Sequence, residues 1–444
     1  MKESPFSLAR AEREAGDHCA VEFAPNAETA GGSFTFAELA RAGAKHGAKF
    51  DQRLPRRPLG LVTSTDAETV TTLFAALDRE QPLLLLHPLA PESARKSVET
   101  KVAQLPLPQG AQLLLETSGS TGAPRWVVHG ANSLAAAARA SAANLGWAPQ
   151  GDRWLLSLPL SHVGGLSILL RCFLGRQTAV IAPLPTNSPK RARAELERLD
   201  ISLVSLVPTQ LARLLEDPDF SFPSRVRLVL IGGARLTDAL RRRAVERGVP
   251  LVSTYGMTEF CSQICTEKPG EPGAGVGPPL PGTDVRLLPD GRIQVRGPTA
   301  CLGYLGRPSP FDAEGWFTTS DRGHWDESGH LHVLGRTDCM IISGGENVHP
   351  ETVEAELLAL PEVRAAGVVG IPDEEWGQRI VAGVVLVPSA RALSASALEK
   401  RWREELRQKL PSFALPKSYV RLDQLPLLGI GKLDRAALLE LLMR

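Results

Sequence analysis

Residues 226–255 read VRLVLIGGARLTDALRRRAVERGVPLVSTY, and this stretch decides the fold. Apolar runs at its beginning and end flank a polar, helical segment. Thr237 or Asp238 can cap that helix, and Gly248 is a typical left-handed terminator. Both runs are apolar throughout rather than alternating, which is typical of strands covered on both faces. The stretch therefore predicts a strand–helix–strand unit.

The same alternation extends toward the N-terminus. Three more apolar runs precede the unit, at Leu155–Pro159, Ala179–Pro183 and Leu203–Pro208. Between the last two, Ser188-Pro189 places a capping hydroxyl before a proline at the first helical position. Strands and helices in series predict an α/β fold with parallel-rich sheets covered by helices.

The pattern changes after about residue 280. Short β-rich runs at 285–288, 292–296 and 330–334 carry Asp290-Gly291 and Ser328-Gly329 turns, which predict hairpins and a small barrel-like β part. A compact α+β unit follows, and its last helix, 396–410, is expected to begin with a Ser396–Glu399 capping box. We predict a large N-terminal domain over residues 1–336 and a small C-terminal α+β domain over residues 338–444.

Composition excludes several classes of function. The 444 residues carry 50 Lys and Arg against 49 Asp and Glu, so the basic excess of a nucleic-acid-binding protein is absent. No apolar run approaches the roughly 18–20 residues of a membrane span. The first residues lack the apolar centre of a signal peptide, so we expect a cytoplasmic protein. The six cysteines are scattered, which argues against a disulfide framework or a zinc site.

The segment TSGSTGAPR, residues 117–125, combines hydroxyl groups, glycines and a cation after an apolar run. Glycines let backbone N–H groups turn toward an anion, hydroxyl groups add donors, and Arg125 adds fixed charge. The pattern indicates a polyphosphate site but does not match a Walker A loop. Alone, it could equally be a solvated linker. The candidate phosphate-binding residues are Thr117, Ser118, Gly119, Ser120, Thr121, Gly122 and Arg125.

This segment resembles the phosphate loop of the adenylate-forming enzymes, which include acyl-CoA ligases, luciferases and peptide-synthetase adenylation domains. Five further segments match that family in the same order, between about residues 113 and 435. They are LPLSH (158–162), YGMTE (255–259), TSD (319–321), GRTD (335–338) and GKLDR (431–435). The chain departs from the family pattern at Arg125, Ser320 and Leu428.

The resemblance implies ATP, Mg²⁺ and coenzyme A as co-substrates and cofactors, with an acyl-AMP intermediate. It implies that Lys432 bridges the carboxylate and the α-phosphate, that Thr258 contacts that phosphate, and that Glu259 binds the metal. Asp321 and Arg336 would bind the ribose. The implied adenine site comprises Gly232, Gly233, Ala234, Tyr255 and Gly256. Asp338 would be the hinge of a mobile C-terminal domain, and Gly344 would line the pantetheine channel.

The segment from Trp154 to Arg171 is also similar to 2-succinylbenzoate–CoA ligases of menaquinone biosynthesis. That substrate keeps one carboxylate charged in a partly apolar pocket, so a buried cation must pair with it. Arg171 follows the apolar run Leu166–Leu170 and is the candidate partner, unless it extends to solvent. His162 is a candidate wall of the pocket rather than a general base. The other candidate acid-binding residues are Gly164, Thr209, Phe260 and Ser262.

Two alternatives stay open. One is another aryl- or acyl-CoA ligase of the same superfamily, for which Arg171 would have no anionic partner. The other is a module that loads a carrier protein or only binds acyl-AMP. Association into homo-oligomers is also compatible with the sequence.

Overall fold

The computed structural model describes residues 3–25, 31–50, 57–117, 125–271, 273–343, 346–428 and 432–443. The predicted phosphate-binding residues from Ser118 to Gly122, and Gly344 of the predicted pantetheine channel, lie outside these ranges. Within them, no helix is long and apolar enough to cross a bilayer.

The main sheet has eight strands in the order β12-β11-β10-β9-β7-β8-β1-β2. The strands are β1 (Cys19–Phe23), β2 (Gly32–Thr35), β7 (Arg153–Leu156), β8 (Thr178–Ile181), β9 (Leu203–Leu206), β10 (Leu228–Ile231), β11 (Leu251–Met257) and β12 (Ser262–Thr266). All five predicted apolar runs form its parallel part. Helices α5 (Ala131–Leu145), α6 (Val163–Gly175), α7 (Pro189–Arg198), α8 (Pro208–Leu214) and α9 (Asp238–Glu246) accompany it. The caps of α9 are confirmed: the Thr237 hydroxyl accepts from the backbone N–H of Leu240, and Gly248 has φ +68°.

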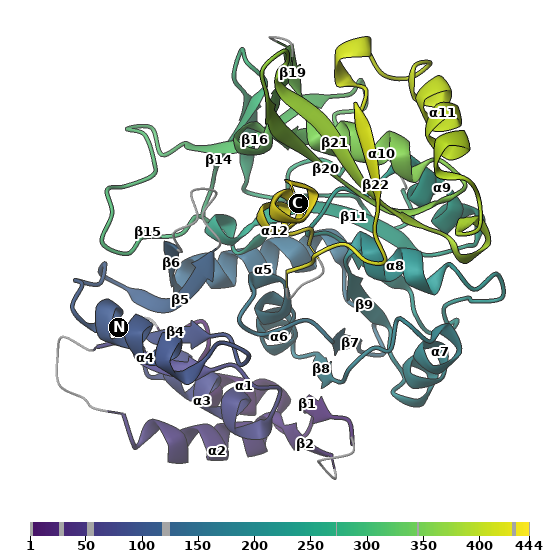
Figure 1. The fold of residues 1–444 in the computed structure, drawn as a ribbon. Helices are drawn as coiled ribbons and strands as arrows, with labels where there is room; N and C mark the ends of the chain where they lie inside the picture. The colour runs from purple at the N-terminus through teal and green to yellow at the C-terminus, as the bar shows by residue number, and fades with distance from the viewer. Residues whose placement is uncertain are drawn as a thin grey trace.

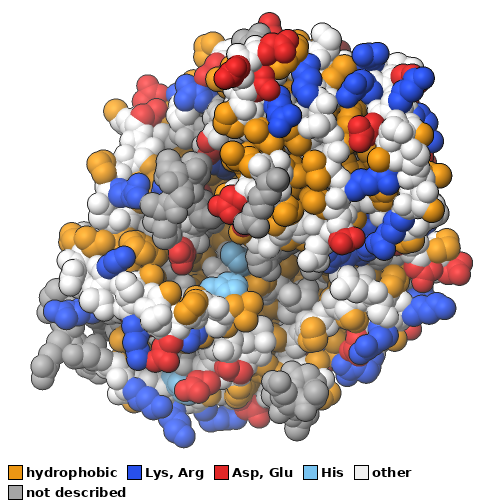
Figure 2. Space-filling view, in the orientation of Figure 1, with side chains coloured by type: hydrophobic (Ala, Val, Ile, Leu, Met, Phe, Trp, Pro, Cys, Tyr) orange, Lys and Arg blue, Asp and Glu red, His pale blue; other side chains and the backbone are white. Residues whose placement is uncertain are grey.

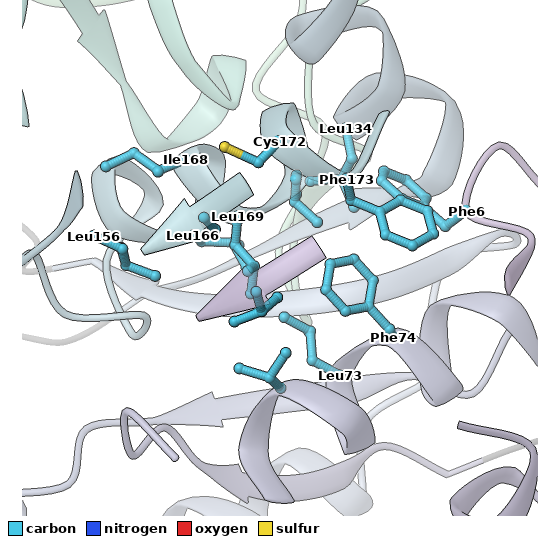
Figure 3. Packing of buried hydrophobic residues seen from close by; sticks show 14 of the residues in the cluster. Phe6, Leu73, Phe74, Leu134, Leu156, Leu166, Ile168, Leu169, Cys172 and Phe173 are labelled. Atoms are coloured by element: carbon cyan, nitrogen blue, oxygen red, sulfur yellow. The ribbon is translucent and has the colours of Figure 1, made fainter. Parts of the chain in front are cut away.

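A second sheet, in the order β15-β6-β5-β4-β3, lies on the other side of α6. Its strands are β3 (Leu59–Val62), β4 (Leu83–Leu86), β5 (Ala111–Thr117), β6 (Arg125–Gly130) and β15 (Gly303–Tyr304), and α1 (Leu8–Ala15), α2 (Phe36–Gly47), α3 (Ala67–Asp78) and α4 (Glu92–Ala103) accompany it. One apolar core joins the two sheets (Figure 3). At its centre the rings of Phe173 from α6 and Phe74 from α3 stack 4.3 Å apart. Helix α6, which carries His162 at its start and Arg171 along its length, is therefore held between the sheets.

The predicted hairpins form a four-stranded antiparallel sheet, β13-β14-β16-β17. Its strands are β13 (Asp284–Leu287), β14 (Arg292–Arg296), β16 (Phe317–Trp325) and β17 (Leu331–Arg336). The short helix η2 (Thr337–Cys339) follows β17 directly. This sheet therefore leads the chain toward the elements of the C-terminal α+β unit.

The described part of the small C-terminal domain contains a five-stranded sheet, three α-helices and two short η helices (Figure 1). Its elements are β18 (Ile341–Ser343), β19 (Glu346–Val348), α10 (Pro350–Leu358), β20 (Val363–Asp373), β21 (Gly377–Leu386), η3 (Pro388–Ala390), α11 (Ala395–Leu406), η4 (Ser412–Ala414), β22 (Ser418–Arg421) and α12 (Arg435–Met443). The predicted capping box is wrong. Helix α11 begins after Ser394, whose side chain makes no capping bond, and it ends at Leu406 rather than residue 410.

Candidate active site

Strands β5 and β6 frame the predicted phosphate segment. They pair antiparallel with Thr117 opposite Arg125, and the Thr117 hydroxyl donates to the Arg125 carbonyl at 3.4 Å. The described residues on either side of segment 118–124 are therefore partners at the end of one strand pair. The predicted role of that segment stays a prediction.

Glu259 lies on the short helix η1 (Thr258–Phe260), directly after β11. Its carboxylate is almost buried and accepts a 2.7 Å hydrogen bond from the hydroxyl of Tyr304. The guanidinium of Arg125 lies over the Tyr304 ring, 5.7 Å from its centroid. Tyr304 thus connects the end of the predicted phosphate loop with the predicted metal-binding glutamate, and the two segments share one site.

Tyr304 was not predicted. Strand β15, which carries it, has two residues and pairs with β6 only through the tertiary fold, so periodicity offers no signal for it. His129 was missed for a similar reason. The Nε2 atom of this buried ring lies 2.8 Å from the Thr258 carbonyl oxygen, and its Nδ1 atom lies 3.1 Å from the Cys261 sulfur. Burial lowers the pKa of His129 to about 4, so the ring is neutral and supports the η1 turn.

The predicted ribose site is assembled from β11, β16 and β17. Asp321 is nearly buried and sits opposite Arg336 in the β16–β17 pair, with 3.7 Å between Oδ1 and the guanidinium. The Tyr255 hydroxyl donates to Asp321 Oδ2 at 2.6 Å. Burial and the negative charge of Asp321 raise the pKa of Tyr255. Arg336 also forms a bidentate pair with Asp338 at 2.8 and 2.6 Å.

Two positions in the predicted adenine site require glycine, one for its backbone conformation and one for lack of space. Gly233 has φ +80°, a conformation that other residues rarely adopt. A side chain at Gly256 would overlap the carbonyl oxygen of Ser262, because the β11–β12 pairing has a bulge there. Ser262 itself has φ +96° and Cys261 φ +52°, so the chain after η1 is strained.

Lys432 reaches this site from the small domain. A Cβ atom on Gly233 would lie 3.9 Å from Lys432 Cε, so the lysine stem passes over the 232–234 turn. Lys432 is exposed to solvent, although groups of both domains lie around it. Burial and the charge of Arg336 lower its pKa, and Asp321 and Glu259 oppose that shift. The predicted ATP-site residues that the structure describes therefore converge from both domains.

His162 forms the N-cap of α6 and makes no side-chain capping bond. Its ring lies 5.8 Å from that of His87. Burial and the nearby charges of His87 and Lys432 lower its pKa to about 4, so it is neutral at pH 7. Figure 2 shows a hollow in this face of the molecule with histidine side chains, in pale blue, at its floor. A neutral ring beside Lys432 suits a pocket wall.

Arg171 is 2% exposed, which excludes its extension to solvent. Its Nε and Nη2 atoms have no hydrogen-bond partner among the described residues, and its guanidinium lies 5.5 Å from the centroid of the Trp154 ring. It lines a small cavity of about 10 Å³ between α5 and α6, with Val163, Leu134 and Cys261 in the wall. His162 is not among the described residues that line it. The cavity holds about one water molecule.

The remaining predicted acid-binding residues are dispersed. Gly164 lies in the first turn of α6 and Thr209 is exposed on α8. Phe260 has no exposed surface and packs edge-on against Phe317 in the core under the antiparallel sheet. Phe260 therefore anchors η1 in this core and does not line accessible space. Ser262 is partly exposed next to it.

The residues present fit a magnesium ion. Among the described ranges no cluster of three or more His, Cys, Asp or Glu side chains could hold a metal by itself. Mg²⁺ is usually held by one or two carboxylates together with water and substrate phosphates. Glu259, with Oε2 free of the Tyr304 bond, provides a carboxylate of that kind.

Comparisons with known proteins agree with this geometry. The profile described as AMP-binding enzyme matches residues 61–305, and that described as AMP-binding enzyme C-terminal domain matches residues 352–432. A 2-succinylbenzoate–CoA ligase of Bacillus licheniformis is 35% identical over 342 residues, which are 73% of this chain and 69% of that protein. Solved structures of o-succinylbenzoate CoA synthetase (MenE) from Bacillus subtilis cover 98% of both chains at 28% identity. Their TM-scores are 0.82 with the acyl-adenylate OSB-AMP and 0.81 with ATP and a magnesium ion.

Proposed function

Because this chain belongs to the family of AMP-binding enzymes, we propose that it is an AMP-forming acid–CoA ligase. It joins a carboxylic acid to the AMP part of ATP, releases pyrophosphate, and passes the acyl group to the thiol of coenzyme A. One observation carries this proposal: Lys432 of the small domain meets Gly233 of the large domain, within the electrostatic reach of Glu259 and Asp321.

The first step brings two anions together, because the acid carboxylate attacks the α-phosphorus as the bond to pyrophosphate breaks. Fixed cations lower the barrier most when they are in place before charge shifts. In this proposal Lys432 neutralises both anions, Thr258 donates to the α-phosphate, and Arg125 neutralises the outer phosphates. Glu259 would hold Mg²⁺, which supplies further neutralisation of the phosphates.

The proposed nucleoside site combines one ion pair with uncharged groups. The Asp321 carboxylate accepts the ribose hydroxyls, with Arg336 beside it. The 232–234 turn and Tyr255 flank the adenine. Because Tyr255 already donates to Asp321, its ring is fixed in orientation before the nucleotide arrives.

The second half-reaction needs a different face of the small domain. The proposed boundary between the domains is Asp338, which follows β17 and pairs with Arg336. Residues 1–336 and 338–444 are proposed to move as two bodies about this hinge. In the second orientation, Gly344 would border the pantetheine arm of coenzyme A, where a side chain would obstruct the thiol.

The proposed acid is 2-succinylbenzoate, and its CoA ester would serve menaquinone biosynthesis in the cytoplasm. The names of the relatives support this choice. Arg171 supports it independently, because a buried guanidinium with two unpartnered nitrogens calls for an anion. The ring carboxylate would be that anion and His162 would border the pocket. Since the cavity at Arg171 holds about one water molecule, α5 and α6 must separate for the acid to reach it.

The test measures both half-reactions with a panel of acids that includes 2-succinylbenzoate. Pyrophosphate release reports the first step, and mass spectrometry of the CoA ester reports the second. We expect acid-dependent pyrophosphate release, thioester with coenzyme A, and loss of the first step in Lys432→Ala. Pyrophosphate release without any thioester would favour a carrier-loading module. A better acid than 2-succinylbenzoate would reject the proposed substrate.

A further inference from the structure

Lys432 lies in a loop of which residues 426–428 and 432–434 are described, and hydrogen bonds join these two parts. The N–H of Leu428 donates to the Lys432 carbonyl at 2.8 Å, and the N–H of Asp434 donates to the Pro426 carbonyl at 2.9 Å. These bonds hold the two described parts of the loop together. They do not fix where Lys432 stands relative to the large domain.

Arg435, three residues later, ties this loop to helix α10. Its guanidinium makes a bidentate pair with Glu354 at 2.5 and 2.9 Å and a further bond to Glu351 at 3.0 Å. It also donates to the Val368 carbonyl at 2.8 Å. Its side chain is 22% exposed and those of the two glutamates 18% and 13%, so solvent screens these pairs only partly.

Helix α10 is in turn docked on the large domain. A Cβ atom on Gly335 would lie 2.6 Å from Glu351 Oε2, so the first turn of α10 abuts the end of β17. Glu354 is also fixed on its own domain, because it accepts from the Val368 N–H at 2.8 Å. A continuous path of contacts therefore runs from Gly335 through Glu351 and Arg435 to the Lys432 loop.

We propose that Arg435 is a positioning residue for Lys432, which sets the lysine for acyl-AMP formation by clamping its loop to α10. The inference rests on the proposed function, in which Lys432 serves the first half-reaction. Positioning matters because a displacement of about 1 Å can cost on the order of 100-fold in rate. The second half-reaction does not use Lys432, so the clamp should not affect it.

The experiment removes the planar guanidinium of Arg435, which makes the bidentate pair with Glu354. Arg435→Lys keeps the charge but loses the bidentate geometry. We expect acyl-AMP formation to fall by about 10- to 100-fold, with thioester formation from supplied acyl-AMP nearly unchanged. Glu354→Gln, which weakens the same pair from the other side, should show the same selectivity. Arg401→Lys, in an ion pair with Glu362 of the same domain, is the matched control and should leave both steps unchanged.

A double-mutant cycle with Lys432→Ala separates positioning from general stability. If Arg435 acts through Lys432, Arg435→Lys causes no further loss of acyl-AMP formation in the Lys432→Ala background. Multiplicative losses, equal losses in both half-reactions, or full activity of Arg435→Lys would each overturn the inference. Normal acyl-AMP formation by Lys432→Ala would reject the proposed role of Lys432 itself, which is a different result.

Discussion

Replacement of Arg171 by methionine should move stability and activity in opposite directions. In the free protein the guanidinium is buried and two of its nitrogens lack partners among the described residues. A buried polar group without partners costs about 1–3 kcal/mol, and the contact with Trp154 offsets about 0.5–2 kcal/mol of that. Methionine has a similar length and no such cost. We therefore expect Arg171→Met to raise the free energy of unfolding by about 1 kcal/mol.

The activity toward 2-succinylbenzoate should fall steeply in the same variant. Removing one partner of a buried charge pair typically costs about 3–5 kcal/mol, which is about 10²- to 10⁴-fold in kcat/KM. A substrate analogue without the ring carboxylate, 4-oxo-4-phenylbutanoate, should lose little. The assay is CoA-dependent thioester formation with both acids, and the melting temperature of the free protein reports stability.

Arg176→Met is the matched control for this experiment. Arg176 follows the same helix and pairs with Glu14 near the surface, so its loss should not discriminate between the two acids. Equal losses for both acids in Arg171→Met would refute the reasoning about the carboxylate. A lower melting temperature would refute the reasoning about the unpaired charge.

Three other perturbations give distinct outcomes. Glu259→Gln should weaken Mg²⁺-dependent ATP binding more than metal-free ATP binding, as calorimetry with and without Mg²⁺ would detect; equal weakening would place the metal elsewhere. Asp338→Pro should impair thioester formation more than acyl-AMP formation, and equal loss would argue against a hinge. The unfolded chain binds a proton at His129 below about pH 6.5, whereas the folded protein does so only near pH 4. Stability should therefore fall by about 2 kcal/mol from pH 7 to pH 5 through this residue, and urea unfolding of His129→Gln should lack that part of the loss.

The sequence predicted the parts of this fold that depend on local pattern. The apolar runs of β7 to β11 and the caps of α9 needed only neighbouring residues. The start of α11 was misplaced because Ser394 and Ser396 are equally suitable capping residues and only the tertiary position of the helix chooses between them. Tyr304 and the partners of Arg435 could not be predicted, because their contacts join residues 45 to 84 positions apart.

In the proposed mechanism, the division of the site between the domains lets one cleft serve two reactions. The large domain carries Glu259, Asp321 and the 232–234 turn, and Lys432 of the small domain reaches them. The ion pair of Arg364 with Glu216 joins the domains at 2.7 Å, but the two side chains are 39% and 45% exposed. Such a pair contributes about 0–1 kcal/mol. Breaking it therefore costs little, so we expect the small domain to withdraw Lys432 after the first step while the large domain keeps the acyl-AMP in place.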